Sequence, residues 1–392
     1  MQFSNLTAGI RGAGVDAWDI HIRATRARAR GEDVFVLSVG DPDFDTPALV
    51  VERAVQSLQD GDTHYAPVIG RDALRDAIAQ RHTAHTDQPV GRDNVIVLAG
   101  AQNGLFATSL CLVQAGDEVI VLQPMYVTYT ACIQATGATL VPVAMPPETG
   151  FRLDRAALAA AITPRTRAIY YASPCNPTGV VLDAEELRFI ADLAKAHDLW
   201  VVADEVYRDV TFDAPHQSIA QFADMAERLV TIGSLSKSHA MTGWRAGWVV
   251  APAPLIAHLG NLALCMLYGL PGFIQEAALV AIRDCDAASA QMRSAYAARR
   301  DLVARALGVV PGLHLVVPQA SMFAFLDIRA TGLASDEFVT RLYAETGVSL
   351  LDGAAFGACG AGHVRLSYAC DESVLAPACQ RIRTFVEALS LR

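Results

Sequence analysis

The sequence predicts an α/β protein built on a mostly parallel sheet. From about residue 93, short apolar runs typical of buried strands alternate with amphipathic stretches of helical period. One such stretch is 185–197, where Leu187, Ile190 and Leu193 recur at helical spacing. Strands that alternate with helices form parallel sheets covered by those helices. The expected strands are 94–99, 118–123, 139–144, 167–172, 199–204 and 229–233.

One further strand is expected to run against the others. Only about six residues separate Lys237 from the apolar run 244–251. A parallel crossover needs roughly a dozen residues or more. The run 244–251 therefore predicts an antiparallel strand in the same sheet.

A second, α+β region is predicted after Pro271. The pattern changes there to a long helix, 274–307, and the chain of 392 residues exceeds the roughly 250–300 that one core serves. We expect a large domain over 46–272 and a small domain over 273–392, with 1–45 packing on the small domain. The further elements expected in the small domain are strands 313–317, 322–327 and 363–368, helix 335–346 and a helix from Ser373.

Composition excludes several classes of protein. With 52% hydrophobic and 18% charged residues the chain is globular rather than disordered. The net charge of −10 argues against nucleic acid as a partner. Apolar runs are far shorter than the ~20 residues that cross a bilayer, and the N-terminus lacks the pattern of a signal peptide. We therefore expect a cytoplasmic protein that does not bind membranes.

The eight cysteines carry no predicted chemistry. They are scattered, without a C-x-x-C pair or histidines at metal-binding spacing. Reduced thiols and no metal site are expected.

Lysine is rare, which narrows the search for an amine nucleophile. Of 31 basic residues only Lys195 and Lys237 are lysines. Lys195 lies on the polar face of an amphipathic stretch and reads as solvated. Lys237 follows a buried strand, at the sheet edge where open α/β sheets bind ligands. A lysine there is suited to a Schiff base with a carbonyl, although an ordinary loop lysine is the alternative.

Other chemistry-bearing residues fall at the ends of neighbouring strands. Ser234, Ser236 and Arg245 offer two hydroxyls and a guanidinium to a phosphate, and Ala101 and Gln102 begin a helix whose free N–H groups bind anions. Each also reads as an ordinary turn or loop.

An acid and an amide complete the set. Asp204 ends an apolar strand, where it serves either as a helix cap or as the partner of a buried cation, and Asn176 lies in a turn after strand 167–172. Together these residues place a lysine, a phosphate cradle, an acid and an amide at one sheet edge. That combination suits pyridoxal 5′-phosphate (PLP).

In the order of these motifs the chain resembles the class I/II aminotransferases of PLP fold type I over essentially its full length. The resemblance implies a large domain with a mostly parallel seven-stranded sheet and a smaller α+β domain. It implies PLP as the cofactor, an amino acid and a 2-oxo acid as substrates, and a homodimer with active sites at the interface.

The resemblance also implies roles for individual residues. Lys237, Asp204 and Tyr207 would be catalytic, with Lys237 forming the Schiff base and Asp204 facing the pyridine nitrogen. Tyr65 would reach the phosphate of the neighbouring subunit. Substrate would be bound by Gly40, Asn176 and Arg365. The cofactor-binding residues would be Tyr65, Ala101, Gln102, Tyr126, Asn176, Asp204, Tyr207, Ser234, Ser236, Lys237 and Arg245.

Particular segments resemble the bacterial arginine:pyruvate branch of this family, among them 17–21 and 261–269. This implies transfer of the amino group of L-arginine to pyruvate, in arginine catabolism. The segments where dicarboxylate-specific relatives carry a distal cation, 101–103 and 265–269, contain none. Trp18, Asp16 and Asp19 are candidates for contacting a guanidinium, and helix capping is the alternative role for the two acids.

Other functions stay open. A broad-range, aromatic or aliphatic aminotransferase, or a PLP-dependent C–S β-lyase, shares the fold and the lysine. A PLP-sensing regulator lacks the spare length for a DNA-binding domain. The dinucleotide fingerprint fails because Gly12 and Gly14 have no preceding strand and no third glycine.

Overall fold

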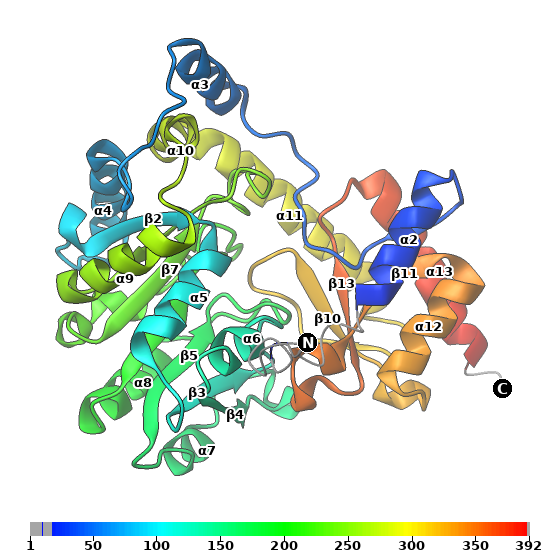
Figure 1. The fold of residues 1–392 in the computed structure, drawn as a ribbon. Coiled ribbons are helices and arrows are strands. Elements are labelled where there is room, and N and C mark those ends of the chain that lie inside the picture. Colours follow the sequence, from blue (N-terminus) through cyan, green and yellow to red (C-terminus); the bar gives the residue numbers. More distant parts are fainter. Residues whose placement is uncertain (1–9, 11–17, 390–392) are drawn as a thin grey trace, which may run out of the picture.

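The fold centres on a seven-stranded sheet. In this computed structural model, residue 10 and residues 18–389 are described (Figure 1). The strand order is β2-β8-β7-β6-β5-β3-β4. All neighbours run parallel except β8, which is antiparallel to both β2 and β7, so the predicted mostly parallel sheet and its one reversed strand are confirmed. The strands are β2 (Val95–Ala99), β3 (Glu118–Gln123), β4 (Thr139–Ala144), β5 (Thr166–Ala172), β6 (Trp200–Asp204), β7 (Leu229–Ser234) and β8 (Ala246–Val250).

Helices cover both faces because alternate strand residues point to opposite sides. On one face, Val121 and Val202 pack with residues of α5, α6 and α9. On the other face, Ile120 and Val201 pack with α8, which opens with a capping box between Asp183 and Glu186. The helices of this part are α5 (Ala101–Leu112), α6 (Tyr129–Gln134), α7 (Arg155–Ala160), α8 (Ala184–Ala196) and α9 (Ala253–Met266).

Two helices replace the single long one expected over 274–307. α10 (Gly272–Asp284) and α11 (Asp286–Leu307) meet at Cys285, whose φ of −115° and ψ of 18° leave the α region. The prediction of one continuous helix was therefore wrong. Helical periodicity continues across one non-helical residue, so the apolar pattern alone does not reveal the break.

A four-stranded antiparallel sheet follows, in the order β12-β13-β10-β9. The strand predicted over 313–317 is reduced to β9 (His314–Leu315), which pairs only with Leu326 and Asp327. The remaining elements are β10 (Phe323–Asp327), α12 (Ser335–Thr346), β11 (Val348–Ser349), β12 (Leu351–Asp352), β13 (His363–Ser367) and α13 (Glu372–Leu389).

The N-terminal part lies beside this second sheet. α2 (Asp19–Ala29) precedes β1 (Phe35–Val36), which pairs in parallel with β11. The chain then crosses to α3 (Ala48–Gln59) and α4 (Asp72–Thr86), at the far side of the large sheet (Figure 1). This crossing segment carries Gly40 past the junction of the two sheets.

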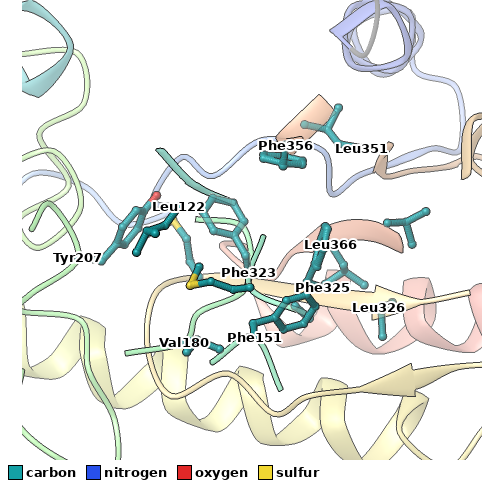
Figure 2. Packing of buried hydrophobic residues seen from close by; sticks show 14 of the residues in the cluster. Leu122, Phe151, Val180, Tyr207, Phe323, Phe325, Leu326, Leu351, Phe356 and Leu366 are labelled. Atoms are coloured by element: carbon teal, nitrogen blue, oxygen red, sulfur yellow. The ribbon is translucent and has the colours of Figure 1, made fainter. Parts of the chain in front are cut away.

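The junction is closed by one apolar cluster. Phe323, Phe325 and Leu366 from the smaller sheet share it with Leu122 and Tyr207 from the large-sheet side (Figure 2). This packing holds β10 and β13 against the edge where β6 and β7 end.

Within the described ranges, none of the helices is long and apolar enough to cross a membrane. Short 3₁₀ turns complete the chain: η2 (Arg92–Asn94), η3 (Pro147–Thr149), η4 (Ile219–Gln221), η5 (Ala223–Met225), η6 (Arg329–Thr331), η7 (Gly353–Phe356) and η8 (Ala358–Gly360).

Candidate active site

A cavity of about 210 Å³ lies at the carboxyl ends of β5, β6 and β7, where open α/β sheets bind ligands. Every residue predicted for the site lines it except Tyr65. The smaller sheet contributes Phe323 and Arg365, and the crossing segment contributes Val39 and Gly40. The other lining residues are Trp18, Ala101, Gln102, Leu105, Tyr126, Ala172, Asn176, Asp204, Val206, Tyr207, Ser234, Ser236, Lys237, Thr242 and Arg245.

Lys237 projects into this cavity from the loop after β7. Its Nζ donates a hydrogen bond to the carbonyl oxygen of Gly40, at 2.6 Å. Burial lowers the pKa of Lys237 to about 8, with the cations of Arg365 and Arg245 acting in the same direction and Asp41 opposing them. The amine therefore loses its proton far more readily than a lysine in water.

Asp204 ends β6 at the base of the cavity. Its Oδ2 accepts a hydrogen bond from the hydroxyl of Tyr129 at 2.8 Å, and its Oδ1 accepts one from the backbone N–H of Val206 at 3.2 Å. Burial nevertheless raises the pKa of Asp204 to about 6. The carboxylate is thus fixed by two hydrogen bonds but has no cation beside it among the described residues. A cationic ligand atom would supply that charge.

Arg365 comes from β13 and is almost fully buried. Its guanidinium lies over the rings of Phe323 and Phe356, 4.1 and 4.8 Å from their centroids. It donates to Oδ1 of Asn176 at 2.9 Å and to the carbonyl oxygen of Ser38 at 2.8 Å. Its buried Nε has no hydrogen-bond partner among the described residues. Burial lowers the pKa of Arg365 to about 10. A buried guanidinium with an unused N–H donor is suited to bind a carboxylate.

An anion site forms where α5 begins. Gly100 precedes the helix at φ 82°, and a Cβ there would lie 2.5 Å from a terminal nitrogen of Arg245, so only glycine allows this approach. Arg245 itself has φ 55° and donates to the carbonyl oxygen of Thr242 at 2.7 Å. Ser234 and Ser236 line the same part of the cavity. Helix N–H groups, hydroxyls and a guanidinium together suit a phosphate.

The aromatic residues predicted for the site occupy its walls. Tyr126 lies edge-to-face with Tyr129, at 6.0 Å between ring centroids. Tyr207 is buried and meets Phe323 at 6.0 Å in the same manner. Tyr65 is 85% exposed and packs against Tyr268, with the rings tilted by 48°, outside the cavity of its own chain.

Some functional contacts were missed by sequence reasoning. The Tyr129–Asp204 hydrogen bond joins residues 75 positions apart, and no local sequence pattern predicts it. The rings of Phe323 and Phe356 over Arg365 depend on the packing between sheets. Of the candidates for a guanidinium contact, Trp18 lines the cavity, Asp19 is exposed and absent from its wall, and Asp16 lies outside the described residues.

The cavity fits PLP. Asp204 is positioned for a cationic ring nitrogen, Lys237 for a carbonyl carbon, and the cradle at Gly100 for a phosphate. Burial disfavours the charged forms of both Asp204 and Lys237. A ligand with these three groups satisfies all of them at once.

Comparisons with known proteins agree with this chemistry. The family described as aminotransferase class I and II matches residues 32–382. The chain is 52% identical to the arginine–pyruvate transaminase of Pseudomonas aeruginosa over 382 residues, 97% of each chain.

Solved structures are similar throughout. Aspartate aminotransferase from Thermus thermophilus with maleate superposes with a TM-score of 0.93 at 33% identity, over 98% of this chain and 99% of that one. An aromatic aminotransferase from Pyrococcus horikoshii gives a TM-score of 0.89 at 37% identity, over 92% and 97%. The chain therefore belongs to the class I and II aminotransferases, which use PLP as their cofactor.

Proposed function

We propose that the enzyme transfers the α-amino group of L-arginine to pyruvate, giving 5-guanidino-2-oxopentanoate and L-alanine in arginine breakdown. The observation that carries this proposal is the 52% identity, over 97% of each chain, to a transaminase with those substrates in its name. The aspartate and aromatic relatives are 31–39% identical.

The charges around the cavity support a donor without a distal carboxylate. Among the described lining residues the cations are Lys237, Arg245 and Arg365. Two of them face the cofactor groups and Arg365 faces the substrate α-carboxylate, so no further cation remains for a second carboxylate. An aspartate or glutamate side chain would lose hydration there without gaining a partner.

The proposed chemistry divides among residues of this chain. Bound PLP supplies an electrophilic carbon and a ring that takes up the electron pair of the substrate Cα. Arg365 and Asn176 orient the α-carboxylate. Lys237 moves the proton between Cα and the cofactor carbon, while Asp204 holds a proton on the ring nitrogen.

The remaining assignments complete the cofactor contacts. Tyr207 and Asn176 would donate to the phenolic oxygen, and Tyr126 would pack against the ring. Ser234, Ser236, Arg245 and the N–H groups of Ala101 and Gln102 hold the phosphate.

The direct test mixes L-arginine with PLP-loaded enzyme in the absence of a 2-oxo acid and follows the cofactor absorbance. We expect arginine to convert the cofactor to its amino form and to yield 5-guanidino-2-oxopentanoate, and pyruvate then to restore the spectrum and yield alanine. L-Aspartate and L-leucine are the comparison donors. Conversion by either of these but not by arginine would refute the donor assignment. Release of pyruvate and ammonia from a cysteine conjugate without any acceptor would identify a β-lyase.

We further propose a homodimer with active sites at its interface. Tyr65 and Tyr268 are exposed beside a hollow formed by 63–66 and 267–271. α3 turns Leu49, Val55 and Leu58 to solvent, while its opposite face packs on α10, beside which Figure 1 shows it. Exposed apolar side chains gathered on one helix and around one hollow are typical of protein interfaces.

The dimer carries a prediction about Tyr65. We expect twice the monomer mass in solution. We also expect Tyr65→Phe to weaken PLP binding roughly tenfold or more, because it removes one hydrogen bond to the charged phosphate across the interface. Equilibrium dialysis of PLP measures this loss, and ultracentrifugation checks that the variant still dimerises. A Tyr268→Phe variant is the matched control. A monomeric, active wild type would contradict the arrangement.

Tyr129 is predicted to position Asp204. Tyr129→Phe removes the 2.8 Å hydrogen bond to Oδ2, and a bond to a charged group contributes about 1.5–3 kcal/mol. We expect the Kd for PLP to rise roughly tenfold or more, measured by cofactor absorbance. Tyr170→Phe is the control, because that buried hydroxyl meets Ser109 rather than the acid. Equal effects of the two substitutions would show that Tyr129 serves packing alone.

We propose a cytoplasmic location for the enzyme. All eight cysteines are free thiols, which suits a reducing compartment. Fractionation of cells that produce the protein tests this directly.

A further inference from the structure

Trp18 is the one candidate for a guanidinium contact that lines the cavity among the described residues, and neither the cofactor nor the α-carboxylate is assigned to it. It lies immediately before α2, is half-buried, and packs against the main apolar cluster while lining the cavity. The cavity wall thus includes an indole from the N-terminal part of the chain.

A chain of contacts fixes Trp18 relative to Arg365. The indole meets His21 edge-to-face, with 5.7 Å between ring centroids and an interplanar angle of 84°. His21 Nδ1 lies 2.9 Å from Oγ of Ser38, and the carbonyl of Ser38 accepts the hydrogen bond from Arg365. The distance between the group that binds the α-carboxylate and the indole is therefore set by the fold.

Few other groups of the cavity wall could bind a positively charged donor side chain. Asp204 is the one carboxylate among the described lining residues, and it lies at the base, bonded to Tyr129. Of the other aromatic rings, Phe323 already covers Arg365 and packs with Tyr207, and Tyr126 is assigned to the cofactor. Trp18 is the ring that remains.

His21 itself adds no positive charge beside the indole. Burial lowers the pKa of His21, and the positive charges of Arg28 and Arg365 lower it further. The imidazole is therefore neutral at neutral pH, and it does not repel a positively charged side chain beside Trp18.

We propose that Trp18 is the specificity-determining residue for the donor side chain, and that it binds a guanidinium through a cation–π contact. This inference rests on the proposed function, because it deepens the assignment of L-arginine as the donor. Tryptophan offers the strongest such face, and the contact does not require a buried carboxylate. A neutral side chain of the same length fits the cavity but gains nothing from the charge.

Turnover by the holoenzyme is the first test. L-Citrulline has nearly the shape of L-arginine without the charge, so the ratio of their kcat/KM values isolates recognition of the cation. We expect Trp18→Leu to lower this ratio by roughly fivefold to tenfold. Trp18→Phe keeps an aromatic face and should retain part of the preference. Trp200→Phe, at the opposite end of β6, is the matched control.

Binding is the second test, independent of turnover. 5-Guanidinopentanoate keeps the carboxylate and the guanidinium but lacks the reacting amine, and 5-ureidopentanoate is its neutral counterpart. Calorimetry on the PLP-loaded enzyme should show tighter binding of the guanidino compound, and Trp18→Leu should remove most of that difference. Quenching of tryptophan fluorescence by the guanidino compound should disappear in Trp18→Phe and persist in Trp200→Phe.

The outcomes separate this inference from the proposed function. If the wild type fails to convert L-arginine, the donor assignment fails whatever Trp18 does. If arginine is converted but Trp18→Leu leaves both the kcat/KM ratio and the Kd ratio within twofold of the wild type, the role of Trp18 is refuted and the donor assignment stands. Equal losses for arginine and citrulline would likewise reduce Trp18 to a packing residue.

Discussion

Replacing Lys237 with alanine is expected to abolish transamination, with a loss on the order of 10⁴-fold or more in the rate of the L-arginine half-reaction. The only other lysine of the chain, Lys195 on α8, donates a hydrogen bond to Asp224 and cannot substitute for it. Single-turnover absorbance measurements with PLP-loaded enzyme measure the loss. Lys195→Ala is the matched control, and it should react at the wild-type rate.

Lys237 should also leave a signature in the cofactor-free protein. Its pKa in the fold is about 8, against 10.5 in an unfolded chain. Below pH 8 the buried ammonium is charged in both states, so its full cost opposes folding. Between pH 8 and 10.5 only the unfolded chain binds the proton, and stability rises with pH.

Lys237→Met, which keeps much of the stem, removes this cost. We expect its cofactor-free Tm to exceed that of the wild type near pH 7, and the difference to shrink as the pH rises from 8 to 10.5. A lower Tm at every pH would mean that the hydrogen bond to Gly40 stabilises the protein more than burial of the amine destabilises it.

The strands could be predicted because burial on both faces leaves a direct record in the sequence. β3 and β7 are buried at every position, and such strands read as continuous apolar runs. The reversed β8 followed from loop length alone. The break at Cys285 could not be predicted, because one non-helical residue changes neither the composition of the segment nor the period of its apolar residues.

The site residues likewise fall into those that the sequence could predict and those that it could not. Lys237, Asp204 and Asn176 follow buried strands, so topology brings them together and their proximity could be predicted. Arg365 was identified only through resemblance, because one arginine on a strand carries no signal among so many. Tyr129 reaches Asp204, and Trp18 reaches the cavity wall, through tertiary packing, which a single sequence does not encode locally.

The second large effect is expected at Asp204. Asp204→Asn keeps the shape and the hydrogen bond from Tyr129 but removes the negative charge that holds a proton on the ring nitrogen. Without that proton the ring takes up the Cα electron pair poorly, and we expect the half-reaction to slow by about 10²–10³-fold. The Kd for PLP should rise as well. Stopped-flow absorbance with L-arginine gives the rate, and equilibrium dialysis gives the affinity.

A cofactor analogue separates charge from shape. PLP methylated on the ring nitrogen carries a permanent positive charge, and Asp204→Ala leaves room for the methyl group. We expect this analogue to restore much of the half-reaction rate in Asp204→Ala. Equal rates with PLP and with the analogue would contradict the role assigned to the carboxylate.

The cofactor-free protein supplies the sign of the electrostatic effect. The pKa of Asp204 is about 6 in the fold, above its ordinary value of 3.8. Above pH 6 the buried carboxylate is charged and opposes folding. As the pH falls from 6 to 3.8 the folded state alone binds the proton, so this cost is relieved. Asp204→Asn should therefore stabilise the cofactor-free protein above pH 6 and lose that advantage towards pH 4. The same substitution weakens PLP binding, so it should raise the Tm of the cofactor-free protein and lower the Tm of the PLP-loaded protein. These opposite shifts would show that Asp204 stabilises the bound cofactor but destabilises the cofactor-free fold.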